Sequence, residues 1–267
     1  MTTILKETNI TGKCLMSAAD STVTLFPSKE KGIRFFSNGE KIEANVSNVI
    51  STQNCVVIGN EKIQVKLIEH FMAACALMGV DSVDVCIEGS EIPILDGSSK
   101  CWFELLQAVG IEKKPLEPVI FDRPLAYAQG NTVISLVPAD KFAISYLVNF
   151  EHPELRNSWV NWTFEGDNAE IIEARTFGYL KDLEMFQKAG LALGASIDNT
   201  VGLTENGYTT NLRSVLEPVK HKILDIIGDL YLTGLNPLNF KAHIIAKEAG
   251  HKSHVEFAKL ILEEKIK

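Results

Sequence analysis

One apolar helix with two ionisable residues near its start constrains this chain most. Residues 65–78 carry apolar side chains at helical spacing, and Gly79 follows as a stop signal. The pattern predicts a largely buried helix, yet Glu69 and His70 lie inside it. A buried carboxylate and imidazole are costly unless they are paired or bind a metal. Either one of the two faces outward and the other is a satisfied core residue, or a partner comes from elsewhere in the chain.

Composition limits the class of protein. Of the 267 residues, 46% are apolar and 22% are charged, which is typical of a globular protein and excludes a disordered, collagenous or coiled-coil chain. The length suits two small domains or one large one. The longest apolar runs, residues 71–80 and 142–150, fall short of the roughly 20 residues that a membrane-spanning helix needs. No membrane insertion is therefore expected.

Charge and cysteine usage narrow the partners and the compartment. A net charge of −8 provides no basic field for a nucleic acid, so none is expected as a partner. The five cysteines form no C-x-x-C pair, which indicates reduced thiols rather than a disulfide framework. Residues 1–13 lack the features of a secretory signal. The expected location is the cytoplasm.

A segment with three prolines divides the chain into two similar parts. Residues 111–124 hold Pro115, Pro118 and Pro124 among charges and show no apolar periodicity. We place a boundary there, between an N-terminal half at 1–117 and a C-terminal half at 118–267. Strands are predicted near 20–26, 33–36, 54–58, 82–88, 126–137, 142–150 and 242–246. Helices are predicted at 65–78, 99–109, 167–174, 178–189, 214–233 and 251–265, so the fold class is α+β.

The helix predicted at 214–233 offers the partner that Glu69 and His70 require. His221, Asp225 and Asp229 recur at intervals of four and share one helical face. With His70, the first two would form a His₂Asp set, which leaves a position open for water as in catalytic zinc sites. Glu69 would then take a proton from that water, which is the chemistry of amide or ester hydrolysis. The common alternative is an exposed i,i+4 pair without function.

A further histidine, His251, follows Gly250 at the start of the last helix. It is either an exposed residue at a helix end or a cationic group that stabilises a developing oxyanion. The contexts of His152, His243 and His254 indicate no role.

Six separate motifs resemble one known family along nearly the whole chain. They are Ile68–Ala74 (IEHFMAA), Glu91–Ser98 (EIPILDGS), Phe150–Pro153 (FEHP), Ala174–Gly178 (ARTFG), His221–Asp229 (HKILDIIGD) and Gly250-His251. Their order is that of UDP-3-O-acyl-N-acetylglucosamine deacetylase, the zinc enzyme of lipid A biosynthesis in Gram-negative bacteria. The resemblance implies two similar α+β halves, each a sheet layered with helices. It also implies that the helices are sandwiched between the sheets, with the site between the halves.

The resemblance implies a role for each matched residue. The zinc ligands are His70, His221 and Asp225, with iron(II) as an alternative metal, and the general base is Glu69. Three further residues would act on the intermediate or leaving group: the general acid His251, the residue that orients it, Asp229, and the hydroxyl donor Thr176. The implied reaction is hydrolysis of the acetamide of an acylated UDP-sugar by water activated at the metal.

Substrate contacts follow from the same resemblance. Phe177 and Asp182 are expected against the sugar or nucleotide, and Lys222 against a phosphate. Residues 180–201 are expected to form an acyl-chain passage, with apolar positions that include Leu180, Leu183 and Ile197. For all of these residues, ordinary core packing is the alternative.

Several positions depart from the family pattern. The segment 14–18 lacks the histidine and glycines of a G-x-H-T-G-like turn, Val137 stands where many members carry lysine, and Lys66-Leu67 replaces a common Ser-Thr pair. These departures leave two alternatives open: a paralogue acting on another N-acetylated sugar, or a non-catalytic nucleotide-sugar binding protein. We expect a monomer that contacts lipid-like substrates peripherally. With no residues after Lys267 for a fused dehydratase, we expect a deacetylase alone.

Overall fold

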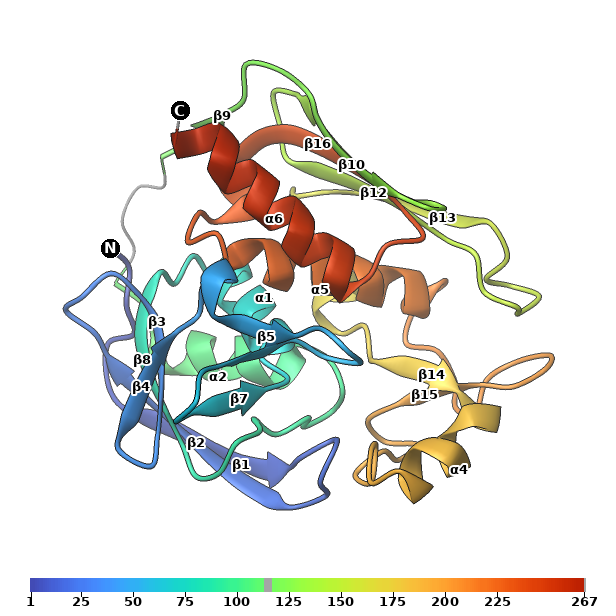
Figure 1. The fold of residues 1–267 in the computed structure, drawn as a ribbon, viewed down its shortest axis with the longest axis horizontal. Coiled ribbons are helices and arrows are strands. Elements are labelled where there is room, and N and C mark those ends of the chain that lie inside the picture. The colour runs from blue at the N-terminus through green and yellow to red at the C-terminus, as the bar shows by residue number, and fades with distance from the viewer. Residues whose placement is uncertain (113–116, 267) are drawn as a thin grey trace.

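Two β-sheets enclose a layer of helices in the computed structural model, which describes residues 1–112 and 117–266 (Figure 1). The first sheet contains, in spatial order, β1 (Thr8–Lys13), β2 (Asp20–Pro27), β8 (Ser82–Ile87), β3 (Gly32–Ser37) and β4 (Glu40–Glu43). The second contains β10 (Leu125–Gln129), β11 (Thr132–Pro138), β16 (Phe240–Lys247), β12 (Ala143–Val148) and β13 (Ser158–Thr163), with β9 (Val119–Ile120) beside β16.

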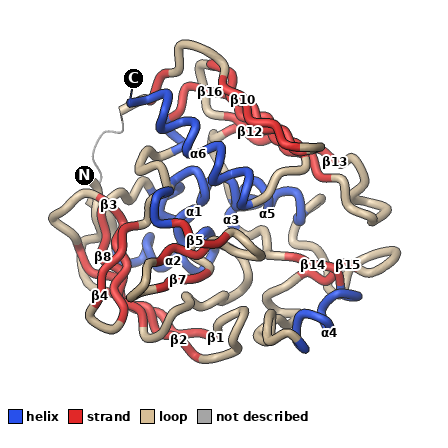
Figure 2. The backbone as a smooth tube through the Cα atoms, in the orientation of Figure 1, coloured by secondary structure: helices blue, strands red, loops and turns tan. Residues whose placement is uncertain are grey.

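The principal helices lie between these sheets (Figure 2). The first half contributes α1 (Glu69–Met78) and α2 (Lys100–Val109), and the second contributes α5 (Glu217–Tyr231) and α6 (His251–Ile266). Each sheet therefore has one face against the helices and one face outside, which fits the alternating burial of strands such as β2 and β16.

The two sheets have the same topology. In each, two antiparallel hairpins come first in the chain, and the strand that follows the long helix then inserts between them. That inserted strand, β8 or β16, pairs antiparallel with the second strand of its sheet and parallel with the third. The expected α+β fold of two similar halves is confirmed. The boundary between 117 and 118 stays a prediction, and Pro115 lies outside the described residues.

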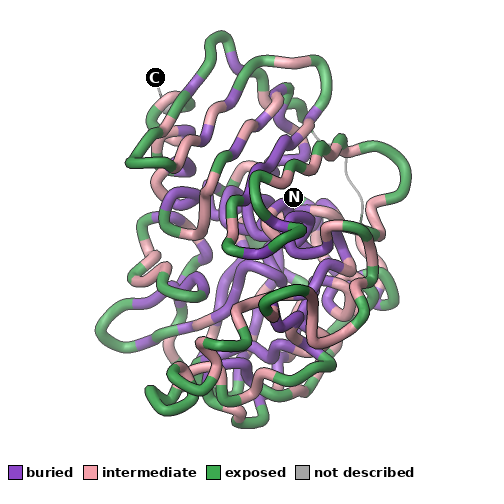
Figure 3. The backbone as a smooth tube through the Cα atoms, turned by 90° about the vertical axis from the view of Figure 1, so that its right-hand side faces the viewer, coloured by how far each residue is buried: buried purple, intermediate pink, exposed green. Residues whose placement is uncertain are grey.

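The core is continuous across the two halves. The residues of α1 from Glu69 to Ala76 are all buried, and α1 packs on α5 of the other half. Gly228 permits this contact, because a Cβ atom there would lie only 2.1 Å from the carbonyl oxygen of Glu69. Figure 3 shows the buried segments concentrated in the middle of the molecule, where the two halves meet. The start of α1 and the facing side of α5 are thus held together in the interior of the molecule.

Each half carries an insertion between its second hairpin and its long helix. In the first half it contains η1 (Val46–Asn48), β5 (Val49–Ser51), β6 (Val57–Gly59) and β7 (Gln64–Lys66). In the second it contains α3 (Ala169–Ile172), β14 (Phe177–Tyr179), α4 (Leu180–Lys188) and β15 (Val201–Leu203). The unit of β14, α4 and β15 projects at the lower right of Figure 1. The remaining element is η2 (Pro237–Asn239).

Some predicted boundaries are corrected by the structure. The helix predicted at 65–78 begins only at Glu69, because residues 64–66 pair with β6 and Leu67 adopts a positive φ of 66°. The strand predicted at 126–137 is a hairpin that turns at Gly130, where φ is 59°. The helix predicted at 178–189 begins at Leu180, after the short strand β14. No helix in the described parts of the chain has the length and apolar character to cross a membrane.

Candidate metal centre and active site

Two helices from different halves bring the predicted metal ligands together. His70 lies in the first turn of α1, while His221 and Asp225 lie one turn apart on α5. The Oδ1 atom of Asp225 is 3.2 Å from Nε2 of His221 and 3.9 Å from Nε2 of His70. The three side chains are buried, and their potential ligand atoms lie within 4.8 Å of one another.

The chemistry of these three residues fits a divalent cation. Asp225 Oδ1 is buried and accepts no hydrogen bond, which is costly for a carboxylate oxygen unless a cation satisfies it. His221 Nδ1 lies 2.9 Å from the carbonyl oxygen of Ala174. Because a carbonyl only accepts, Nδ1 carries the proton and Nε2 keeps the lone pair that a metal needs.

The protonation states of the same three residues also favour metal binding. Burial, reinforced by the neighbouring His221, lowers the pKa of His70 to about 3, and burial also lowers the pKa of His221. Although burial alone would raise the pKa of Asp225, His221 and Lys222 hold it well below its usual range. Two neutral imidazoles and one carboxylate form a borderline donor set that suits zinc or iron(II).

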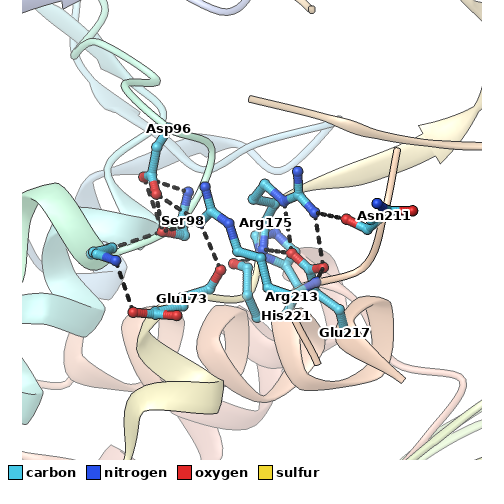
Figure 4. A network of polar contacts seen from close by, with 10 residues as sticks. Asp96, Ser98, Glu173, Arg175, Asn211, Arg213, Glu217 and His221 are labelled. Atoms are coloured by element: carbon cyan, nitrogen blue, oxygen red, sulfur yellow. Dashed lines mark hydrogen bonds and ion pairs between the residues drawn. The ribbon is translucent and has the colours of Figure 1, made fainter. Parts of the chain in front are cut away.

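A polar network fixes the carbonyl that orients His221 (Figure 4). Next to Ala174, Arg175 donates to Glu217 from its backbone nitrogen at 3.0 Å and from Nε at 2.8 Å. Glu217 opens α5, one turn before His221, and also accepts from the backbone nitrogen of Arg213 at 2.6 Å. Segment 174–175 is thereby tied to the helix that carries the ligand.

The same network joins the two halves. Arg213 donates from Nη1 to Asp96 Oδ2 at 2.7 Å and to the carbonyl oxygen of Glu173 at 2.9 Å (Figure 4). Ser99, beside the start of α2, donates its hydroxyl to the carbonyl oxygen of His70 at 2.7 Å. Residues near the ligands from α1 and from α5 therefore have polar links to the same 96–99 turn.

Glu69 is placed to act as a base. Only 2% of its surface is exposed, and Oε2 accepts a hydrogen bond from the backbone nitrogen of Val56 at 3.1 Å. Burial raises the pKa of Glu69 to about 7, against the opposing effect of His251. A carboxylate with such a pKa can take up and release protons near neutral pH.

His251, in contrast to Glu69, is placed to donate a proton. Its Nδ1 atom donates to Asp229 Oδ2 at 2.8 Å, and its Nε2 atom lies 3.8 Å from Glu69 Oε1. Burial would lower the pKa of His251, but Asp229 and Asp225 outweigh it and raise the pKa to about 9. The ring is therefore a cation at neutral pH, with an Nε2 proton available for donation.

A cavity of about 510 Å³ opens onto these groups. Its polar end is formed by His70, His221, Asp225, Glu69, His251, Thr176 and Lys222. Its apolar wall includes the predicted residues Phe177, Leu180, Leu183 and Ile197, together with Phe150, Phe186, Leu191 and Leu203. Asp182 is half-buried on α4 and does not line the cavity. Asp229 lies behind His251 rather than in the wall.

Lys222 lies at the junction of the polar and apolar parts. Its Nζ atom is 2.6 Å from Asp225 Oδ2 and 5.5 Å from the centre of the Phe177 ring. The ammonium group is therefore paired with the carboxylate of a candidate ligand while it remains partly open to the cavity.

The turn at residues 14–18, which differs from the family pattern, also contributes to the cavity wall. Leu15 and Met16 line it, and the buried Glu91 accepts hydrogen bonds from the backbone nitrogens of Met16 at 2.7 Å and Ser17 at 3.3 Å. Gly194 of the second insertion packs against this turn, since a Cβ there would lie 2.1 Å from the carbonyl oxygen of Cys14. Leu15 and Met16 are not among the site residues that the sequence predicts, and the altered motif at 14–18 is the signal that indicates them.

Comparison with known proteins places the chain in a family. Residues 1–263 match the UDP-3-O-acyl N-acetylglycosamine deacetylase family. The chain belongs to this family. The resemblance found in the six motifs is thus confirmed over almost the full length.

Individual members of the family are similar along most of the chain. A UDP-3-O-acyl-N-acetylglucosamine deacetylase from Trichormus variabilis is 35% identical over 267 residues, covering 94% of this chain and 94% of the relative. One from Leptospira biflexa is 36% identical over 230 residues, covering 84% of this chain and 75% of the relative. One from Syntrophotalea carbinolica is 34% identical over 271 residues, covering 97% of this chain and 87% of the relative. The matched region therefore covers three quarters or more of each of these relatives.

Proposed function

We propose that this chain hydrolyses the acetamide of a UDP-3-O-acyl-N-acetylglucosamine to acetate and the free 2-amino sugar nucleotide, the committed step of lipid A biosynthesis. The observation that carries the proposal is the buried, unpartnered Oδ1 of Asp225 beside two neutral histidines, at the polar end of a largely apolar cavity. Family membership and the names of the relatives support the choice of substrate. The reaction is that of a metal-dependent amidohydrolase.

Each polar residue has a defined task in this reaction. His70, His221 and Asp225 would hold a divalent metal ion, which would supply a Lewis acid for the carbonyl oxygen and lower the pKa of a water molecule. Glu69 takes the proton of the attacking water as the C–O bond forms. His251 donates from Nε2 to the departing nitrogen as the C–N bond breaks, with Asp229 orienting its ring. The Thr176 hydroxyl and the charge of His251 stabilise the developing oxyanion.

The cavity supplies the substrate contacts. Its apolar wall, with Leu180, Leu183 and Ile197, would accept the 3-O-acyl chain. We assign Phe177, whose ring centre lies 6.0 Å from that of His221, to the sugar ring. Lys222 provides a positive charge for a phosphate. The family resemblance also assigns Asp182 to the sugar nucleotide, a contact that requires the substrate to extend beyond the cavity lining.

The remaining attributes follow from this chemistry. Zinc is the metal we propose, with iron(II) as the alternative, because two imidazoles and a carboxylate suit both ions. We propose a cytoplasmic monomer that meets its amphiphilic substrate by peripheral contact.

Acetate release from UDP-3-O-acyl-N-acetylglucosamine tests the proposal. The purified protein is stripped of metal and then refilled with one equivalent of zinc, and the stripped protein serves as the control. Zinc-dependent release supports the proposed reaction and substrate together. Turnover of a different N-acetylated sugar alone would identify a paralogue, and absence of turnover with zinc bound would overturn the proposal.

A further inference from the structure

Two histidines share the carboxylate that orients His251. Asp229 is fully buried, and its Oδ2 atom accepts from Nδ1 of His251 at 2.8 Å and from Nδ1 of His254 at 2.7 Å. Its Oδ1 atom is buried without a hydrogen-bond partner. Within the described residues, both hydrogen bonds to this carboxylate therefore come from the first turn of α6 and meet on one oxygen.

His254 is itself held from behind by the second sheet. The side chain is fully buried, and its Nε2 atom lies 2.9 Å from the hydroxyl of Tyr146 on β12. That hydroxyl is also 2.8 Å from the carbonyl oxygen of Ala249, just before α6. Close contacts thus run from a central strand through His254 and Asp229 to His251.

This arrangement limits how Asp229 can move. A carboxylate with a single donor can rotate about its Cβ–Cγ bond, whereas two donors on the same oxygen from one helix fix its plane. If His254 were absent, His251 would be the single hydrogen-bond donor among the described residues to the buried Asp229 carboxylate. The orientation of the His251 ring and that of the carboxylate would then depend only on each other. Small errors in placing a proton donor reduce turnover strongly.

We propose that His254 is a positioning residue: with Tyr146 behind it, it holds Asp229 so that the His251 ring keeps Nε2 directed toward Glu69 and the cavity. The inference rests on the proposed function, because that function makes His251 the proton donor to the leaving amine. His254 does not line the cavity and acts through Asp229.

Paired substitutions distinguish positioning from core filling. His254→Phe preserves an aromatic ring but removes the donor to Asp229, whereas His254→Asn leaves a smaller side chain but retains an N–H near the position of Nδ1. If His254 only filled space, Phe would be the milder change, because Asn leaves a cavity in a close-packed interior. If His254 positions Asp229, Asn is the milder change.

Steady-state kinetics of the zinc-loaded wild type and both variants measure the effect. We expect His254→Phe to lower kcat by about 10- to 100-fold with KM nearly unchanged, and His254→Asn to recover most of the loss. Wild-type kcat in His254→Phe, an equal loss in His254→Asn, or a change confined to KM would each overturn the inference. A wild type without turnover would count against the proposed function instead.

Nitrogen-15 NMR of the histidine rings in the zinc-loaded protein needs no substrate. We expect a proton on Nδ1 of both His251 and His254 in the wild type, and faster exchange of the His251 Nδ1 proton in His254→Phe. The signals are assigned by comparison with His251→Gln. An unprotonated Nδ1 on His254 in the wild type would overturn the inference, even if neither His254 variant folded or the wild type showed no turnover.

Discussion

Three histidines in one site differ in charge because their partners differ. His70 and His221 are buried beside each other, so the cost of placing a charge there lowers both pKa values. His251 is also largely hidden from water, with 11% of its side chain exposed, yet Asp229 and Asp225 raise its pKa to about 9. The neutral pair suits metal binding, and the cation suits proton donation. Residue type alone assigns neither task.

At the residue scale, Glu69→Gln tests the base. The amide has the shape of the carboxylate but takes no proton, so we expect acetate release to fall by about 10²- to 10⁴-fold. Zinc content should stay at the wild-type level, because the three proposed ligands remain. Acetate assays and metal analysis on the same sample measure both. The exposed Glu61→Gln serves as the control, and near-normal turnover of zinc-loaded Glu69→Gln would contradict the assignment.

A second residue-scale prediction concerns stability and pH. Burial would raise the pKa of Glu217, but hydrogen bonds from Arg175 and the Arg213 backbone outweigh it and lower that pKa. A carboxyl whose pKa is lower in the folded state stabilises the fold fully above its unfolded pKa of about 4.3. That stabilisation is lost as the pH falls through the lower, folded value.

Glu217→Gln should therefore destabilise the protein most at neutral pH. Removing one partner of a buried ion pair typically costs about 3–5 kcal/mol, because Arg175 is left without its counter-charge. We expect the difference in unfolding free energy from wild type to narrow as the pH falls below about 4. Urea unfolding across a pH series measures this difference, and a gap independent of pH would contradict the prediction.

At the scale of elements, the contact between α1 and α5 brings the two halves of the site together. His70 and Asp225 can share a metal only if these helices approach closely, and Gly228 makes that approach possible. Ridge-and-groove packing alone leaves helix axes 8–10 Å apart, and a residue without a side chain lets them meet near the lower end of that range.

Gly228→Ala tests this contact. The added Cβ would lie 2.1 Å from the oxygen and 2.9 Å from the carbon of the Glu69 carbonyl, both backbone atoms. We expect a net loss of about 1–3 kcal/mol in unfolding free energy, despite the better helix propensity of alanine. Zinc affinity should fall as well, because the ligands on the two helices separate. Denaturant unfolding and a competitive zinc titration measure the two effects.

The control is Gly207→Ala, where the nearest atom to an added Cβ is the Thr204 hydroxyl at 3.9 Å. That variant should match the wild type within about 0.5 kcal/mol. Equal stability of Gly228→Ala and wild type would show that the helices can separate at no cost.

At the scale of the whole molecule, two sheets that share the same order of five main strands cover one helical layer. Neither half buries its helices alone, since α1 of the first half packs on α5 of the second. The candidate site therefore lies where the halves meet, and its proposed ligands come from both. The Arg213–Asp96 pair adds a polar link across the same boundary.

The shared core predicts that both halves unfold together. Trp102 on α2 reports on the first half, while Trp159 and Trp162 on β13 report on the second. Variants that retain only one set of tryptophans, with phenylalanine at the other positions, should give coincident urea transitions by fluorescence. Two transitions with separate midpoints would indicate halves that fold independently.

Local patterns in the sequence were enough to predict the class of fold and many of the candidate residues. Helical periodicity identified most of α1, α5 and α6, and the six motifs identified the family, because both signals depend on residues close together in the chain. The predicted start of α1 was one turn too early, because the pairing of β7 with β6 overrides the helical pattern at 65–66.

Other properties depend on contacts between distant segments, and only the tertiary structure decided them. The packing of α1 on α5 brings Asp225 Oδ1 to within 3.9 Å of His70 Nε2 and buries both side chains at the end of the cavity. Desolvation and neighbouring charge then determine which histidine is neutral and which is a cation. His254 had no recognisable context in the sequence, because its partners Asp229 and Tyr146 come from another helix and from a strand of the second sheet. Spacing along a chain specifies which faces are apolar, but the partner of a buried polar atom is a property of the packed molecule.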